Sequence, residues 1–349
     1  MTIVCFLVTD SERGSITNIG YIHRNCVEYI NDIDITADEN IDSTLPDDNM
    51  FGVVDETHDD VKRSTVQRDT NEVTFGKRGK EIGEYQDATG ITCISRDNVL
   101  VTDMINGRIQ CCKRDGTTLA VYGGDEISEP WSTCVTEKEL IVMTSRRRRV
   151  VKIVSKDGDV LWSFGAGFFQ SPCGVCVDND GNFIVTDSLS HNVSMHDRHG
   201  KFLRYLGDTN VEEQQFRSPR YVCTSPRGHI IVSDSGHHCL KVFDKNGDYL
   251  RTIGRFGKNY GELKSPYGVC TDSFGHILVA DHYNNRISMF TPDGAFVCHV
   301  LDKCHGIIHP KGLSLSPGLS LYVTVGHLKA CSVKVFQLQC QDATSIVTV

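Results

Sequence analysis

Short apolar runs recur along the chain from about residue 73 to residue 338, and each is bounded by turn residues. One phrase is repeated five times: an Asp, or a Ser in its place, closes an apolar run, and a Gly follows thirteen residues later. Successive phrases are separated by 42, 42, 47 and 47 residues, a period typical of propeller blades and solenoids. The five pairs are Asp103/Gly116, Ser145/Gly158, Asp187/Gly200, Asp234/Gly247 and Asp281/Gly294.

The third repeat predicts four short strands, which we call a to d in chain order. They cover residues 174–177, 183–186, 193–196 and 202–206. Clusters of Gly, Asp, Asn and Ser separate the strands, as tight turns require. A four-stranded sheet of this size cannot bury both faces by itself, so the repeats are expected to pack face to face in a closed ring.

A sixth, degenerate repeat covers residues 311–338 and lacks an obvious fourth strand. Residues 72–75 precede the first repeat and have the pattern of a strand d. We therefore predict an all-β, six-bladed propeller with four-stranded blades, in which this N-terminal strand completes the sixth blade. Closing the ring in this way leaves no open sheet edge.

The clearest repeat covers residues 253–294 and contains SPYGVCTDSFGHILVADHYNNRISMFTPDG. It resembles the NHL repeat, and residues 73–338 resemble the propeller that ends the tripartite-motif NHL (TRIM-NHL) proteins. This resemblance implies a non-catalytic recognition platform for a protein or an RNA, in a ubiquitin-ligase or post-transcriptional repression pathway. The chain has no RING or B-box array of Cys and His, so ligase activity would have to come from a longer isoform or a partner.

Charge separates the propeller from what precedes it. Residues 1–74 carry 5 Lys/Arg and 16 Asp/Glu, whereas residues 75–340 carry 31 and 28. We predict an acidic, largely irregular segment over residues 1–71, with room for a strand or two in its first thirty residues. The propeller then covers residues 72–340 and a tail covers residues 341–349. Because the propeller alone is mildly basic, the net charge of −9 does not argue against an anionic partner.

The cysteines indicate packing rather than disulfides, metal binding or catalysis. The chain has 15 Cys, and five of them are assigned to one position of the apolar strand a: Cys93, Cys134, Cys176, Cys223 and Cys270. Cys at such positions behaves as a small buried hydrophobe in a reducing compartment. With no signal-peptide pattern and no apolar stretch as long as a membrane span, the expected location is the cytoplasm. No metal or other cofactor is expected.

The loops between strands b and c are the candidate partner-binding surface. Their residue ranges are 104–108, 146–150, 188–192, 235–239, 282–286 and 328–332, and none contains Asp or Glu. Loops with one sign of charge suggest an anionic partner: single-stranded or stem-loop RNA, or a protein such as a ubiquitination substrate or a ligase component. DNA and membranes are not expected. The candidate residues are Arg108, Arg146, Arg147, Arg148, Arg149, His237, His238, Tyr283, Asn285 and Arg286.

The residue between Pro and Gly at the head of strand a is expected to face the mouth of the central channel on the same side. In order of the blades these residues are Thr89, Trp131, Cys173, Arg220, Tyr267 and Lys311. Trp131, Arg220, Tyr267 and Lys311 offer rings to stack on a base and cations to hold a phosphate. Two alternatives stay open: the rings fill the channel as core residues, and the arginine run is a solvated turn.

An enzyme is the competing interpretation, because six-bladed propellers also serve as hydrolases or lyases with a metal at the channel mouth. Such sites need several carboxylates or His side chains that converge. The six mouth positions supply neither. The repeated aspartates Asp103, Asp187, Asp234 and Asp281 are expected to be structural, with each carboxylate accepting backbone N–H groups of its own b–c loop.

Overall fold

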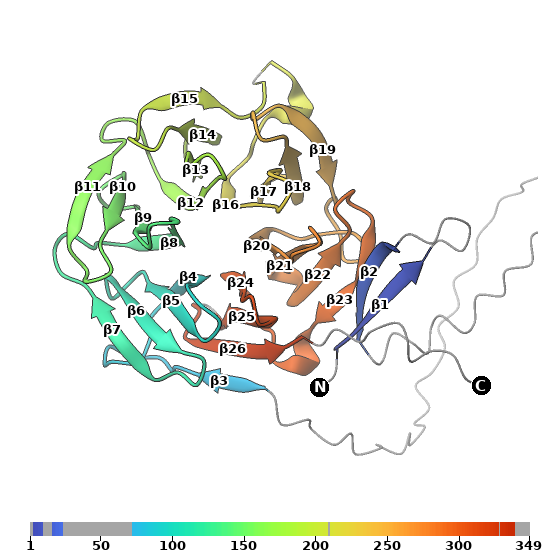
Figure 1. Ribbon diagram of the computed structural model, residues 1–349, viewed down its shortest axis with the longest axis horizontal. Coiled ribbons are helices and arrows are strands. Elements are labelled where there is room, and N and C mark those ends of the chain that lie inside the picture. The colour runs from blue at the N-terminus through green and yellow to red at the C-terminus, as the bar shows by residue number, and fades with distance from the viewer. Residues whose placement is uncertain (1–2, 10–15, 24–71, 209, 328, 339–349) are drawn as a thin grey trace, which may run out of the picture.

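The structure is a computed structural model that describes residues 3–9, 16–23, 72–208, 210–327 and 329–338. Residues 73–337 contain six four-stranded antiparallel sheets set around a central axis (Figure 1). The expected all-β, six-bladed propeller is confirmed. The acidic stretch 31–71 and the tail 341–349 lie outside the described residues, so the proposed domain boundaries stay predictions.

Each blade begins next to the axis and ends at the rim (Figure 1). Blade I has β4 (Ala88–Cys93), β5 (Asn98–Asp103), β6 (Arg108–Lys113) and β7 (Thr118–Tyr122). Blade II has β8 (Pro130–Val135), β9 (Ile141–Ser145), β10 (Val150–Val154) and β11 (Val160–Phe164). Blade III has β12 (Pro172–Val177), β13 (Phe183–Asp187), β14 (Asn192–His196) and β15 (Phe202–Tyr205).

The remaining three blades follow the same plan. Blade IV has β16 (Pro219–Thr224), β17 (Ile230–Asp234), β18 (Cys239–Phe243) and β19 (Tyr249–Ile253). Blade V has β20 (Pro266–Thr271), β21 (Ile277–Asp281), β22 (Arg286–Phe290) and β23 (Phe296–Leu301). Blade VI has β24 (Leu313–Leu315), β25 (Ser320–Val325), β26 (Ser332–Gln337) and β3 (Val73–Phe75).

Strand β3 closes the ring by joining the N-terminal side of the propeller to its last blade. It pairs antiparallel with β26, with Phe75 opposite Val333 and Val73 opposite Val335 (Figure 1). The Lys334 ammonium also donates to the Glu72 carboxylate beside this pairing. Blade VI is therefore completed by the strand that the sequence analysis assigned to it.

The apolar core lies between neighbouring blades. Between blades V and VI, for example, Leu278 and Met289 pack in one buried cluster with Leu321, Val323 and Phe336. The second strand of each of these blades is buried at every position. Because a neighbouring blade covers each face of these strands, their sequences are mostly apolar and do not alternate between apolar and polar residues.

Glycine in strand a lets the inner strands of adjacent blades approach closely. A Cβ atom on Gly174 would lie 2.7 Å from the Cα of Tyr221, and one on Gly268 would lie 2.4 Å from the carbonyl oxygen of Lys311. Both neighbours are backbone atoms of the next blade, which cannot yield as a side chain does. These glycines therefore set the spacing of the ring around the channel.

The strand pairing corrects one detail of the repeat alignment. In blades II to V the cysteines of strand a occupy one position, opposite the third residue before the repeated Asp or Ser. In blade I that position is Thr92, opposite Leu100, and Cys93 lies one residue later. The assignment of Cys93 to the common position is therefore wrong. Burial raises the pKa of the Cys93 and Cys223 thiols to about 12, as expected for unreactive packing residues.

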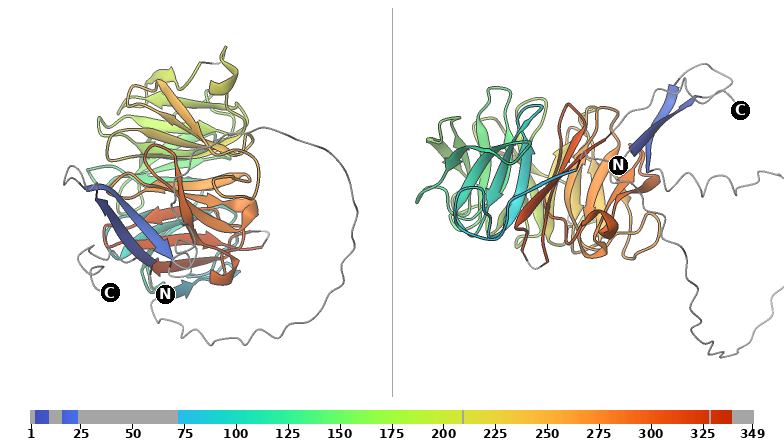
Figure 2. Two further views of the ribbon diagram at one scale, coloured as in Figure 1. Left: turned by 90° about the vertical axis from the view of Figure 1, so that its right-hand side faces the viewer. Right: turned by 90° about the horizontal axis from the view of Figure 1, so that it is seen from below.

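Strand direction alternates within a blade, so the loops gather on two opposite faces of the ring (Figure 2). We call the face that carries the b–c loops and the loops joining consecutive blades the b–c face. The face that carries the a–b and c–d turns is the turn face. A separate hairpin of β1 (Ile3–Thr9) and β2 (Ile16–His23) lies beside β23 at the rim of blade V (Figures 1 and 2).

Candidate functional site

A row of alternating cations and rings lies at the channel mouth on the b–c face. The guanidinium carbon of Arg220 is 5.5 Å from the ring centroid of Trp131 and 5.2 Å from that of Tyr267. Arg146 covers Trp131 at 4.7 Å, and Tyr267 stacks on His282 at a centroid distance of 4.2 Å. We call these five residues the mouth cluster. They come from blades II, IV and V, so the closed ring assembles a site that no single blade contains.

Two donors of the mouth cluster have no acceptor. The Nε of Arg220 and the Nε1 of Trp131 are buried, and neither has a hydrogen-bond partner among the described residues. Trp131 as a whole is only 4% exposed. A buried donor without an acceptor costs about 1–3 kcal/mol. An anion or another acceptor bound at the mouth would remove that cost.

The floor beneath the mouth cluster is firmly held. Tyr221 is buried between Trp131 and Tyr267, with centroid distances of 6.4 and 6.2 Å, and its hydroxyl donates to the carbonyl of Thr89. Burial raises the pKa of Tyr267, although the nearby Arg220 guanidinium acts in the opposite direction. Both phenols therefore stay neutral, and the charge of the cluster is that of its two arginines.

Lys311, the remaining charged mouth residue, is already neutralised. Its ammonium lies 2.6 Å from Oδ1 of Asp87, and both side chains are buried. Asp87 also accepts the backbone N–H of Ala330 at 3.1 Å. Lys311 therefore ties blade VI to the loop before blade I. It takes no part in the contact between Arg220 and Tyr267.

The arginines of the b–c loops fall into two groups, and the first group lies inside the protein. Arg286 is 8% exposed, and its Nε lies 2.8 Å from Oδ2 of Asp281. Its terminal nitrogens donate to the carbonyls of Lys258 and Glu262 at 2.8 Å each. These contacts occupy the guanidinium, so Arg286 is not available on the exposed partner-binding surface expected from the sequence.

Arg108 repeats this arrangement in blade I. Its Nε lies 3.2 Å from Oδ2 of Asp103, and its Nη2 donates to the carbonyls of Glu81 and Glu84. The repeat pattern D-x-x-N-x-R contains this arginine, which was the signal that it serves the fold. Asn106 and Asn284 occupy the Asn position and also donate to their aspartates.

The second group is the loop Arg146–Arg149 between β9 and β10. Arg146 turns inward, donating from Nε to Ser171 Oγ at 3.0 Å while it covers Trp131. Arg147, Arg148 and Arg149 are exposed, and none has an ion pair among the described residues. We call these three residues the basic loop. Its three charges face solvent directly beside the mouth cluster.

Acidic side chains lie on the same face, in the loops that join the blades. The expectation of one charge sign is right for the b–c loops but wrong for the face as a whole. One of them, Glu126, pairs with Lys152, whose ammonium holds the pKa of that carboxyl below its usual value. The acids of these loops next to blades II and IV are Asp125, Glu126, Glu129, Asp208, Glu212 and Glu213.

The other predicted b–c residues mostly brace neighbouring loops. His237 lies 2.8 Å from Oδ2 of Asp234, and His238 accepts the N–H of Ser265 through Nδ1 at 2.9 Å. Asn285 accepts the N–H of His309 through Oδ1 at 2.9 Å. Tyr283 differs, because the residue is 53% exposed and its ring lies edge-on against His282. It extends the row of rings outward from the mouth cluster.

The repeated aspartates serve the fold, but the donors differ from the prediction. Asp187 does accept N–H groups of its own b–c loop, from Leu189 and Ser190. The donors common to the four aspartates come instead from the segment just before strand a, such as Ser171 for Asp187 and Lys264 for Asp281. Burial raises the pKa of Asp234 and Asp281 in spite of these bonds.

The described residues contain no group of three or more His, Cys, Asp or Glu side chains placed to hold a metal ion. His282 is near the mouth, but its Nδ1 donates to the carbonyl of Pro310, and burial lowers its pKa to about 4. No helix in the described part of the chain is both long and apolar enough to span a bilayer.

Comparison with known proteins agrees with the repeat. The family model "NHL repeat" matches residues 169–194 and 216–243. The chain is 31% identical over 140 residues to Protein brain tumor of Drosophila melanogaster, which covers 38% of this chain and 14% of that protein. It is 31% identical over 137 residues to B-box type zinc finger protein ncl-1 of Caenorhabditis elegans, with coverage of 37% and 16%. The chain thus matches about a seventh of the length of these relatives.

Enzymes are also among the similar proteins. A probable peptidyl-alpha-hydroxyglycine alpha-amidating lyase, pgal-1 of Caenorhabditis elegans, is 38% identical over 64 residues, 18% of each chain. A gluconolactonase of Xanthomonas campestris superposes with a TM-score of 0.57 at 18% identity, covering 76% of this chain and 94% of that one. A streptogramin B lyase superposes with a TM-score of 0.54 at 13% identity, covering 76% and 97%. At these identities the superpositions support the fold alone.

Proposed function

Because the chain is an NHL-repeat β-propeller with TRIM-NHL relatives, we propose that it is a non-catalytic recognition module that binds an anionic macromolecule on its b–c face. The observation that carries this proposal is the mouth cluster beside the basic loop. It combines buried or half-buried rings, two buried donors without acceptors and exposed arginines without ion-pair partners among the described residues.

Single-stranded RNA is the partner that this combination fits best. An exposed ring such as Tyr283 offers a platform for an unstacked base, and stacking of this kind contributes about 1–3 kcal/mol per base. The basic loop would hold the phosphates on either side. Each phosphate neutralised on a single strand adds about −0.7 to the slope of log affinity against log salt.

An acidic segment of a protein is the second candidate. The loops of the b–c face carry both acidic and basic side chains, and this mixed charge favours it. Asp125 and Glu129 lie in the loop beside the arginines, and alternating signs are typical of protein interfaces that select one register. In that case the module would recruit a ubiquitination substrate or a ligase component, and a RING domain elsewhere would supply the ligase activity.

The enzymatic alternative is a metal-dependent hydrolase or lyase, and the 64-residue match to an amidating lyase favours it over other enzymes. A lactone, ester and peptidyl-hydroxyglycine panel, measured before and after dialysis against chelator, tests it. Activity lost with the chelator and restored by metal would replace the recognition proposal for the channel mouth.

The test of RNA binding is fluorescence anisotropy of the full chain with a randomised 12-nucleotide RNA at 50 and 200 mM salt. The variant Arg147→Ser/Arg148→Ser/Arg149→Ser should bind at least tenfold more weakly and with a shallower salt slope. The matched control removes three exposed cations of the turn face, Arg96→Ser/Arg227→Ser/Lys245→Ser, and should change the affinity less than twofold. Equal losses in both variants, or no salt-sensitive binding, would refute RNA recognition on this face.

A further inference from the structure

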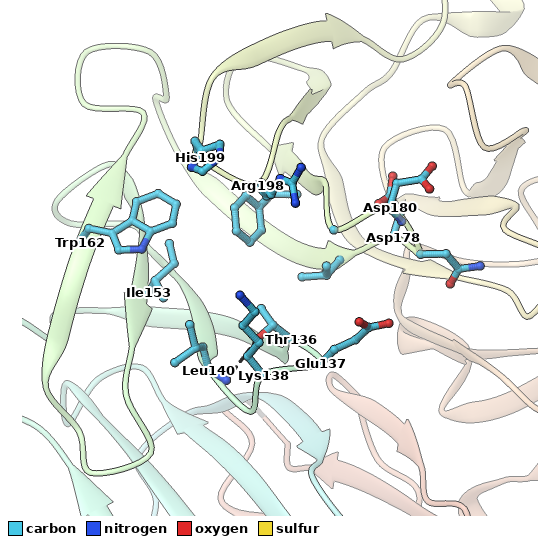
Figure 3. A pocket seen from close by; sticks show the side chains of 14 residues that line it. Thr136, Glu137, Lys138, Leu140, Ile153, Trp162, Asp178, Asp180, Arg198 and His199 are labelled. Atoms are coloured by element: carbon cyan, nitrogen blue, oxygen red, sulfur yellow. Dashed lines mark hydrogen bonds between the residues drawn. The ribbon is translucent and has the colours of Figure 1, made fainter.

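The turn face carries a cavity between blades II and III that has no part in the proposed b–c face function. Its volume is about 590 Å³, within the range of small-molecule sites (Figure 3). The a–b turns of both blades, the strand β11 and the c–d turn of blade III form its walls. It lies on the opposite side of the ring from the mouth cluster.

One wall of the cavity is apolar and firmly packed. Ile153 and Phe183 are 1% and 3% exposed, and Leu140 and Trp162 pack against the same core cluster while staying half-buried. The Trp162 ring meets Phe183 edge-on at a centroid distance of 6.1 Å. Its position is therefore held from behind, while the indole faces the cavity (Figure 3).

The residue at the position of Trp162 distinguishes this gap from the gaps after blades III and IV, whereas blade I has Ala120 there. At the same position, blade III has Arg204 and blade IV has Arg251. Arg204 reaches the c–d turn of the next blade, where it donates to the carbonyl of Asn246 and the carboxylate of Asp248 at 2.9 Å each. Arg251 likewise donates to the carbonyl of Pro292. Trp162 makes no such bridge, so the gap to blade III stays open.

Two cations line the cavity without partners. Lys138 and Arg198 are exposed, and neither has an ion pair or side-chain hydrogen bond among the described residues. Figure 3 shows Lys138 and Arg198 on opposite walls of the cavity, whereas the carboxylates of Glu137 and Asp180 point away from it.

The third acid of the wall is occupied. Oδ1 of Asp178 accepts the N–H groups of Asp180 and Asn182 at 2.9 and 2.7 Å. Its Oδ2 accepts from the side chain of Asn182 at 2.9 Å. These bonds hold the Asp178 carboxylate against its own a–b turn, so the charged groups left to meet a ligand in front of the indole are Lys138 and Arg198.

We infer that this cavity binds an amphipathic carboxylate. The apolar or aromatic body of the ligand would lie against Trp162, Leu140 and Ile153, and its carboxylate would lie between Lys138 and Arg198. The free energy would come from covering apolar surface that the fold leaves open, and the head group would supply the selectivity. The ligand is either a free small acid or the C-terminal residue of a peptide, since both present this chemistry.

Tryptophan fluorescence tests the inference directly, because the chain has only two Trp residues and Trp131 lies on the other face. In the full chain with Trp131→Phe, all of the tryptophan fluorescence comes from Trp162. The probes are 4-phenylbutyrate, 4-phenylbutanol and 4-phenylbutylamine, which share one body and differ in the head group. The carboxylate should give a saturable change and bind at least tenfold more tightly than the alcohol or the amine. Equal affinities, or no saturable change up to 10 mM, would overturn the inference.

Two variants locate the binding site. Lys138→Gln/Arg198→Gln should lower the phenylbutyrate affinity at least tenfold, whereas the control Lys156→Gln/Arg227→Gln should change it less than twofold. Trp162→Arg copies blade III and should close the cavity, so calorimetry should detect no binding although circular dichroism shows a folded propeller. Retained binding in this folded variant would place the ligand elsewhere and overturn the assignment.

A peptide ending in Phe, with a free or an amidated C-terminus, distinguishes the two sources. Binding of the peptide with a free carboxylate, but not of the amidated peptide, identifies a peptide terminus as the ligand. Binding of phenylbutyrate but of neither peptide identifies a free small acid. Neither result depends on RNA binding, which involves the opposite face.

Discussion

The b–c loops of blades V and II occupy the same place in the repeat but use their arginines in opposite ways. In blade V, Asp281 closes strand b, and Arg286 turns inward to meet it. In blade II the corresponding residues are Ser145 and Val150, so there is neither a buried carboxylate nor an arginine to pair with it. Arg147, Arg148 and Arg149 of the blade II loop extend outward instead, and Arg146 turns toward Trp131. The comparison teaches that the repeat's aspartate decides whether a basic side chain of this loop serves the fold or the surface.

Blade II keeps its loops in place by other means. The Ser145 hydroxyl donates to the carbonyl of Ser128, and the buried Lys152 ammonium pairs with Glu126. These bonds fasten the loop between blades I and II, the task that Arg286 performs for the loop between blades IV and V. Arg148 adds only an exposed hydrogen bond of 3.3 Å to the carbonyl of Asp125, so the charges of the basic loop stay accessible to a partner.

The largest expected effect comes from removing the buried arginine. Arg286→Met leaves Asp281 buried without its charged partner, which typically costs about 3–5 kcal/mol of unfolding free energy. Arg148→Met removes the same charge from the exposed loop of blade II and should change stability by less than about 0.5 kcal/mol. Urea unfolding at neutral pH compares the two. Equal stabilities would mean that Arg286 does not hold the blade together.

Lowering the pH should reduce the stability of the fold through blade V but not through the corresponding position of blade II. His299 accepts a hydrogen bond from Arg286, and burial together with that cation lowers its pKa to about 4. The corresponding position in blade II is Ser163, which does not titrate. Because the folded-state pKa lies below the usual 6.5, the unfolded chain takes up the proton first. Stability is therefore complete above pH 6.5 and is lost as the pH falls toward 4.

The variant His299→Gln should flatten this dependence without abolishing it. His196 and His282 are buried with pKa values also lowered to about 4, so they contribute in the same direction. Melting temperatures at pH 7, 6, 5 and 4.5 should therefore fall less in the variant than in the parent protein. An unchanged pH profile would exclude His299 as a contributor.

The strand repeat, the six blades and the closing strand follow from the sequence because each leaves a local pattern of apolar runs and turn residues. The roles of the arginines do not follow as easily. The repeat pattern reveals Asp281 as a partner of Arg286, but its other acceptors include the carbonyls of residues 258, 259 and 262, and backbone carbonyls leave no trace in a sequence. The cavity beside Trp162 was missed for a similar reason. Blade II lacks the arginine bridge found in blades III and IV, and only the paired registers of the strands reveal that difference.

The smallest expected effect concerns the turn itself. Arg149 has a left-handed backbone with φ of 57°, at the position where blade I has Gly107 with φ of 62°. A left-handed non-Gly residue costs about 1–2 kcal/mol, but Gly also gains freedom in the unfolded chain, so Arg149→Gly should stabilise the protein by less than about 1 kcal/mol. It should also weaken RNA binding, because one exposed charge is lost. Arg147→Gly loses the same charge at a residue without positive φ, so it should weaken binding equally and lower the melting temperature. If Arg149→Gly melts below the parent protein, the left-handed backbone of Arg149 is not strained. The arginine at this position then does not lower the stability of the fold.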